Sequence, residues 1–151
     1  MVSKFKKKLL VTGGAGFIGS NFINYIHRCY PNYKILLLDA LTYVGNLDNI
    51  SSSLKANHHF EFFHGNITHP DIVSKLVAEA DIVVHFAAES HVDNSISGPM
   101  SFINTNILGT AMLLEICQSY IKSQNNNYFK FLHVSTDEVF GSVSYTHLTL
   151  P

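Results

Sequence analysis

The sequence has little of several features that mark particular classes of protein. The formal charge is −1, and the one basic run, Lys4 to Lys8, fits a solvated N-terminus better than a nucleic-acid surface. The two cysteines, Cys29 and Cys117, do not suggest a disulfide framework. From the apolar spacing we expect no stretch of membrane-spanning length and no signal peptide before the first predicted strand. We expect a cytoplasmic protein with no nucleic-acid or membrane partner.

Histidine is plentiful, but the spacing typical of metal ligands is missing. None of the nine histidines forms a helical His-x-x-x-His pair or a Cys/His cluster with zinc spacing. We therefore expect no metal site. The apolar fraction of 46% and the length of 151 residues are sufficient for one packed domain.

A short apolar run, Lys8 to Thr12, is followed by glycines at Gly13, Gly14, Gly16 and Gly19. After them comes a segment with helical apolar spacing that stops near Cys29, before a proline. A strand, a glycine turn and a helix in this order are typical of a site for a dinucleotide pyrophosphate. The glycines allow backbone amides to approach the phosphates, and the helix N-terminus favours negative charge.

An acidic residue follows the second predicted strand, 34–38, at the distance that a dinucleotide site requires. Asp39 lies twenty residues beyond Gly19, where such folds place the carboxylate that binds the adenosine ribose hydroxyls. The carboxylate would repel a 2′-phosphate, so it favours NAD over NADP. The simpler alternative is that Asp39 caps a turn after the strand.

The remaining apolar runs alternate between strands and helices. Strands are predicted over 60–63, 81–86 and 129–134, a short helix within 41–54, and helices from Pro70 and over 99–122. The long helix is expected to bury its apolar positions, which are Phe102, Ile103, Ile107, Leu108, Met112, Leu113, Ile116 and Cys117. The pattern predicts an α/β fold, a doubly wound parallel sheet of the Rossmann type with strand order 3-2-1-4-5.

Five segments together resemble a known family, the extended short-chain dehydrogenase/reductases, and within it the dehydratases that act on dTDP-glucose. They span 11–20, 39–47, 87–93, 105–110 and 134–141. The resemblance implies cofactor contacts to NAD at Gly13, Gly16, Phe17, Ile18, Gly19, Asp39, Ala40, Leu41, Thr42, Asn66, Ile67, Phe86, Ala87, Ala88, Ser90 and Thr105. At Asn66 the family often has Asp, and the amide keeps a hydrogen-bonding carbonyl.

The resemblance also implies a hydro-lyase reaction: dTDP-glucose would give dTDP-4-keto-6-deoxyglucose and water, with NAD regenerated in each turnover. Glu138 would remove the C5 proton, and Asp137 would protonate the departing C6 hydroxyl. Thr136 would bind the C4 hydroxyl, and Ser90 would also lie near the substrate. Two carboxyl groups with opposite tasks need environments that separate their pKa values. The alternative for Asp137 and Glu138 is a pair of solvated loop acids.

The family's redox base has no counterpart in this sequence. No Tyr-x-x-x-Lys occurs after Glu138, and the one such spacing, Tyr30 to Lys34, lies far from the chemistry. Residues 142–151 do not resemble the corresponding segment of the family. We therefore expect an incomplete NAD-binding domain over 1–141 and a foreign tail over 142–151, inactive alone and a homodimer when full length. The alternatives are an NAD-dependent sugar-nucleotide 4-epimerase, which usually lacks the Asp-Glu pair, and a non-catalytic dinucleotide-binding module.

Overall fold

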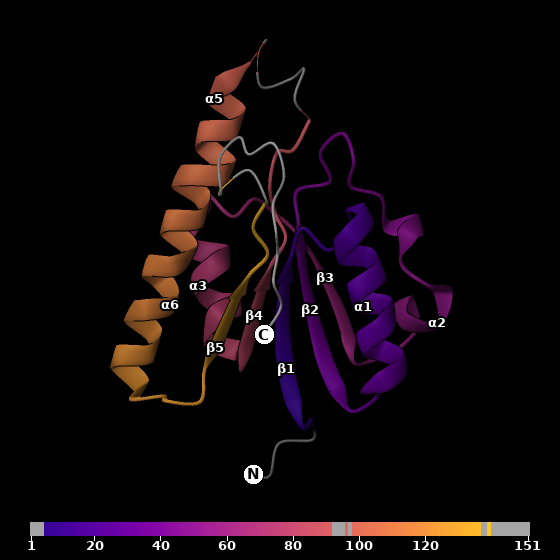
Figure 1. The fold of residues 1–151 in the computed structure, drawn as a ribbon. Coiled ribbons are helices and arrows are strands. Elements are labelled where there is room, and N and C mark those ends of the chain that lie inside the picture. The colour runs from indigo at the N-terminus through magenta and orange to yellow at the C-terminus, as the bar shows by residue number, and fades with distance from the viewer. Residues whose placement is uncertain (1–4, 92–95, 97, 137–138, 140–151) are drawn as a thin grey trace, which may run out of the picture.

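A computed structural model describes residues 5–91, 96, 98–136 and 139 (Figure 1). Five parallel strands form one sheet in the order β3-β2-β1-β4-β5. Their bounds are β1 Lys7–Thr12, β2 Tyr33–Asp39, β3 Phe60–His64, β4 Ile82–His85 and β5 Lys130–His133. The predicted strand order and the Rossmann-type fold class are confirmed.

Helices cover both faces of the sheet. Figure 1 shows α1 and α2 on one side of the strands and α3 and α6 on the other. The helical bounds are α1 Phe17–Cys29, η1 Leu47–Asn49, α2 Ser52–Lys55, α3 Pro70–Glu79, α5 Pro99–Phe102, η2 Ile103–Gly109 and α6 Thr110–Gln124. The predicted ends of α1 and the proline start of α3 agree with these bounds.

Alternation along the central strands divides the core in two. In β1, Leu10 packs with α3 and α6, whereas Leu9 and Val11 pack with α1 and α2. Successive side chains of a strand point to opposite faces, so a strand covered on both sides is apolar throughout. This explains why the apolar runs are continuous rather than alternating with polar residues.

The long helix differs from its prediction along its N-terminal half. Its segments α5, η2 and α6 follow one another without a break, and η2 is π-helical. Leu113 and Cys117 are buried as expected, but Ile103, Ile107 and Leu108 are 39%, 61% and 54% exposed. A π-helix bonds from i to i+5 rather than i to i+4, so an apolar face drawn at α-helical spacing is displaced there. The predicted burial of these three side chains was wrong.

Among the described residues, one helix is long and apolar enough to cross a membrane. It runs from Pro99 to Gln124 and has a mean hydropathy of 1.3 over its most apolar window. The expectation that no stretch approaches this length is therefore corrected. A single such helix is weak evidence for a membrane, because helices of soluble proteins also meet this criterion.

Among the described residues, those that pack on the outer strand β5 lie on one of its faces. Phe131 packs against the cluster shared with α3 and α6, but Leu132, which points the other way, is 52% exposed. No β5 side chain belongs to the described cluster on the α1 side of the sheet. Within the described part of the chain, the sheet is thus well buried around β1 and β2 and packed on one face at β5.

Candidate functional site

A cleft of about 1000 Å³ lies at the carboxyl ends of the strands. Parallel sheets of this order bind ligands at that edge, where the chain leaves adjacent strands in opposite directions. The residues that line it are Gly13, Gly16, Phe17, Ile18, Gly19, Leu38, Asp39, Ala40, Thr42, Val44, Gly45, Gly65, Asn66, Ile67, Phe86, Ala87, Ala88, Glu89, Ser90, Phe102, Thr105, Asn106, Thr110, His133, Val134, Ser135 and Thr136.

The glycine turn between β1 and α1 forms one wall of the cleft. Gly13 has φ +70, and a Cβ there would lie 2.5 Å from the Ala87 nitrogen, so both conformation and space require glycine. At Gly16, a Cβ would approach the protein's own atoms no closer than 3.4 Å. Packing does not demand glycine at Gly16, but a side chain would occupy space in the cleft. The residue is suited to a ligand that approaches the backbone closely.

The N-terminus of α1 lies beside this turn, and its first amides have no acceptor within the helix. The Ser20 amide donates to the Gly16 carbonyl oxygen at 2.9 Å, whereas the preceding amides of the first turn have no partner within a helix. The N-cap of α1 is Gly16, so no side chain at this position caps the helix. These amides, with the positive end of the helix dipole, suit a phosphate.

Asp39 lies at the end of β2 and is only 8% exposed. Its Oδ2 accepts a hydrogen bond from the Ala15 amide, and its Oδ1 accepts one from the Leu41 amide, both at 2.8 Å. A carboxylate offers about four acceptor positions, so the group keeps capacity for ligand hydroxyls. The turn-cap alternative and the ribose-binding interpretation are therefore compatible at this residue.

Leu41 itself is the one predicted cofactor residue that does not line the cleft. It has φ +48, and its amide donates back to Asp39 while Ala40 and Thr42 on either side face the cavity. The structure places Leu41 in the turn that holds the carboxylate, and its contact with the cofactor stays a prediction.

The far end of the cleft is built around Asn66 and Ile67. The Asn66 Oδ1 accepts hydrogen bonds from the Thr68 amide and hydroxyl, both at 3.0 Å. These bonds fix the side chain in a local turn. A smaller cavity of about 420 Å³ shares Asn66, Glu89 and Thr105 with the main cleft. The carbonyl oxygen does the accepting, so Asn66 forms this turn at a position where the resemblance implies that Asp is frequent.

The segment after β4 is held by a residue to which no role was assigned from the sequence. Asn106 donates to the Glu89 carbonyl oxygen and accepts from the Glu89 amide, both at 2.8 Å. This pair of bonds fixes the chain between Ala87 and Ser90 against the long helix. Asn106 belongs to one of the segments that resemble the family, but nothing in its spacing indicated a backbone partner 17 residues away.

A buried histidine lies beneath the floor of the cleft and was also missed. The Nδ1 of His85 lies 2.6 Å from the Thr12 hydroxyl and its Nε2 lies 3.0 Å from the Thr110 hydroxyl. Burial, and to a smaller degree the nearby His133, lowers the pKa of His85 to about 4. The neutral ring joins the end of β1 to the start of α6.

The fourth side of the cleft is formed by the end of β5 and the residues after it. His133, Val134, Ser135 and Thr136 line it, so Thr136 faces the same cavity as Asp39 and the glycine turn. The predicted acid–base residues Asp137 and Glu138 lie outside the described residues, as do the tail over 142–151 and the domain boundary at 141. Within the described ranges, no three His, Cys, Asp or Glu side chains gather as metal ligands.

Comparison with known proteins gives consistent results. The family described as GDP-mannose 4,6 dehydratase matches residues 10–149. A dTDP-glucose 4,6-dehydratase of Xanthomonas campestris is 47% identical over an alignment of 142 positions, which covers 91% of this chain and 40% of that protein. The crystal structure of a dTDP-glucose 4,6-dehydratase from Streptomyces venezuelae, with NAD and TYD bound, has a TM-score of 0.80 at 40% identity and covers 92% of this chain.

Epimerases are structural relatives as well. A UDP-N-acetylglucosamine 4-epimerase from Methanobrevibacter ruminantium has a TM-score of 0.78 at 25% identity and covers 97% of this chain. The chain spans about 40% of the length of these relatives. The resemblance found in the sequence is confirmed, and this chain belongs to the GDP-mannose 4,6 dehydratase family.

Proposed function

We propose that this chain is the NAD-binding part of a nucleotide-sugar 4,6-dehydratase. The observation that carries the proposal is the shared cleft, in which Asp39, the glycine turn and Thr136 face one cavity. The geometry fits a dinucleotide, because Gly16 leaves its backbone open and Asp39 keeps acceptor positions free. The 2′-position of the ribose would lie near a negative charge, which favours NAD over NADP.

The residues that we propose hold the cofactor occupy different parts of the cleft. The amides of Phe17 and Ile18 bind the pyrophosphate, Asp39 binds the adenosine ribose, and Asn66 with Ile67 lies beside the adenine. When bound, NAD supplies a hydride acceptor that returns the hydride later in the same turnover.

In the longer protein we propose dehydration of dTDP-glucose to dTDP-4-keto-6-deoxyglucose, a step in nucleotide-sugar metabolism. Thr136 hydrogen-bonds the C4 hydroxyl, Glu138 removes the C5 proton, and Asp137 donates a proton to the C6 oxygen as it leaves in water. These roles rest on the resemblance and on the position of Thr136 at the cleft. The chain alone has no Tyr-x-x-x-Lys after Glu138, so we propose that it binds NAD without turning over substrate.

Two experiments test these proposals separately. Titration of the purified chain with NAD and NADP by calorimetry should show saturable NAD binding and weaker NADP binding. Incubation of the longer protein with dTDP-glucose should give a product that has lost the mass of one water. A product of unchanged mass would instead support a 4-epimerase, the second candidate, which the structural likeness to an epimerase favours. NAD binding without either product would support the non-catalytic module.

For assembly, we propose a homodimer formed through the exposed apolar side chains of the long helix. Ile107 and Leu108 project from a helix of which only 17% of the most apolar window is buried. We propose a cytoplasmic location, in which the two thiols remain free. We propose no membrane partner and no nucleic-acid partner. Light scattering after gel filtration of the longer protein, with Ile107→Glu as the disrupting variant, measures the assembly.

A further inference from the structure

The carbonyl oxygen of Ala15, in the middle of the glycine turn, accepts two hydrogen bonds from one neighbouring loop. The Asn46 amide donates at 3.1 Å, and the side-chain amide of Asn49 donates at 3.0 Å. Ala15 is completely buried, whereas Asn46 and Asn49 are exposed residues of the neighbouring loop. Asn46 and Asn49 belong to the segment between β2 and α2, which the sequence predicted only as a loop with a short helix.

These bonds fix the direction of the next peptide unit. A peptide is planar, and the unit between Ala15 and Gly16 is held at both ends, because the Gly16 amide donates to the Gly13 carbonyl oxygen at 3.3 Å. The preceding unit is held by Asp39 through the Ala15 amide. Glycine residues make the turn intrinsically soft, and these contacts remove that freedom just before the amides of Phe17 and Ile18.

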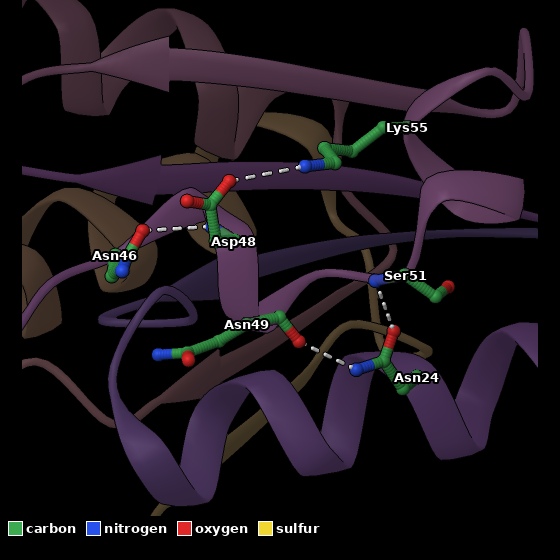
Figure 2. A network of polar contacts seen from close by, with 6 residues as sticks. All are labelled: Asn24, Asn46, Asp48, Asn49, Ser51 and Lys55. Atoms are coloured by element: carbon green, nitrogen blue, oxygen red, sulfur yellow. Dashed lines mark hydrogen bonds and ion pairs between the residues drawn. The ribbon is translucent and has the colours of Figure 1, made fainter.

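Asn49 is in turn held by α1. Figure 2 shows the side chain of Asn24, on α1, between the backbones of Asn49 and Ser51, while the Asn49 side chain points the other way. The Asn24 side-chain amide donates to the Asn49 carbonyl oxygen at 2.9 Å, and its Oδ1 accepts from the Ser51 amide at 3.0 Å. Asn24 therefore sets the position of Asn49 along the helix whose N-terminus faces the cleft.

We infer that Asn49, held by Asn24, is a positioning residue for cofactor binding. It fixes the Ala15 carbonyl and thereby directs the first amides of α1 at the diphosphate of the dinucleotide. The inference rests on the proposed NAD site and adds to it a selective effect. Loss of the Asn49 amide loosens the diphosphate contacts and leaves the adenosine contacts at Asp39 in place.

Dissociation constants of the full 151-residue chain for NAD, ADP and adenosine test this inference. NAD and ADP are titrated by calorimetry, and adenosine by NMR. Asn49→Ala should weaken NAD and ADP about threefold to tenfold, the effect of one lost hydrogen bond to a buried carbonyl. Adenosine affinity should change by less than about twofold. Asn24→Ala should also weaken NAD and ADP binding more than adenosine binding. It replaces Asn49→Ala in the experiment if that variant does not fold.

The matched control is Asn57→Ala. This asparagine also bonds a nearby backbone group, accepting from the His59 amide at 2.9 Å, but it lies at the amino end of β3, away from the cleft. It should leave all three affinities unchanged. If Asn49→Ala leaves NAD affinity unaltered, or lowers adenosine affinity as much as NAD affinity, the inference about Asn49 is wrong and the proposed function still stands. Failure of the unsubstituted chain to bind NAD and ADP overturns the proposed function and this inference together.

Discussion

Acidification should destabilise this protein through His85 before most of its carboxyl groups titrate. The ring contacts the hydroxyls of Thr12 and Thr110 and packs near Phe131 and His133, with centroid separations of 6.2 and 5.2 Å. Protonation would place a charge in this buried site next to a second ionisable ring. Proton uptake by His85 therefore favours the unfolded chain.

The size of the effect is set by the pKa of His85, which burial lowers from 6.5 to about 4. A group with a lowered folded-state pKa contributes stability that is fully present above pH 6.5 and is lost as the pH falls toward 4. At pH 5 the unfolded histidine is mostly protonated and the folded one mostly neutral. The loss from this one residue is then about 2 kcal/mol relative to pH 7.5.

Urea unfolding of the chain and of His85→Gln at pH 7.5 and pH 5 measures this loss. Glutamine has similar length and does not titrate, so the variant should be less stable at pH 7.5 but should lose about 2 kcal/mol less on acidification. Carboxyl groups titrate in both proteins and cancel in the comparison. The exposed neighbour His133 contributes only the smaller part of the His85 shift. His133→Gln should therefore still lose stability on acidification, by slightly less than the unsubstituted chain. Equal losses in the chain and in His85→Gln would refute the reasoning.

Three further predictions concern the cleft and the thiols. Gly16→Val should abolish detectable NAD binding in calorimetry with little change in the urea midpoint. Gly13→Ala should destabilise the fold by at least about 1 kcal/mol, because Gly13 has φ +70 and a Cβ there would collide with the backbone of Phe86 and Ala87. Asp39→Asn should weaken NAD binding about tenfold or more, and unchanged NAD affinity would exclude a ribose contact. The new side-chain NH2 group would face the Ala15 or the Leu41 amide, which is also a donor, so the free energy of unfolding in urea should fall by about 1–3 kcal/mol. A thiol reagent at pH 8 should modify exposed Cys29 rapidly and Cys117 only in urea, because burial raises the pKa of Cys117 to about 12.

Local patterns determine most of the sheet and could be read from the sequence. The residues Leu9–Thr12 are buried on both faces of the sheet, and glycine and proline mark where the elements end. For this reason β1 and α1 were predicted within a residue or two. Strand order could be predicted from the parallel connections. The face of the long helix was misjudged, because the π-helical segment over Ile103–Gly109 has no distinct signature in the apolar spacing.

Parts of the site that depend on distant partners were not accessible in this way. The positions of Asp39 and Gly16 could be predicted from spacing within one structural unit. The pairing of Asn106 with Glu89, and of His85 with Thr12, joins residues 17 and 73 positions apart. A neutral buried histidine and an exposed one look alike in a sequence, since only the fold decides which of them water reaches.

The paired hydrogen bonds of Asp39 to the backbone have a consequence for any attempt to change cofactor preference. Admitting a 2′-phosphate would seem to require only that the negative charge be replaced by a neutral or basic side chain. The same carboxylate, however, holds the Ala15 amide in place, and a replacement that cannot accept there would disturb the wall that receives the diphosphate. A successful redesign would have to supply a new acceptor for Ala15 together with the basic group.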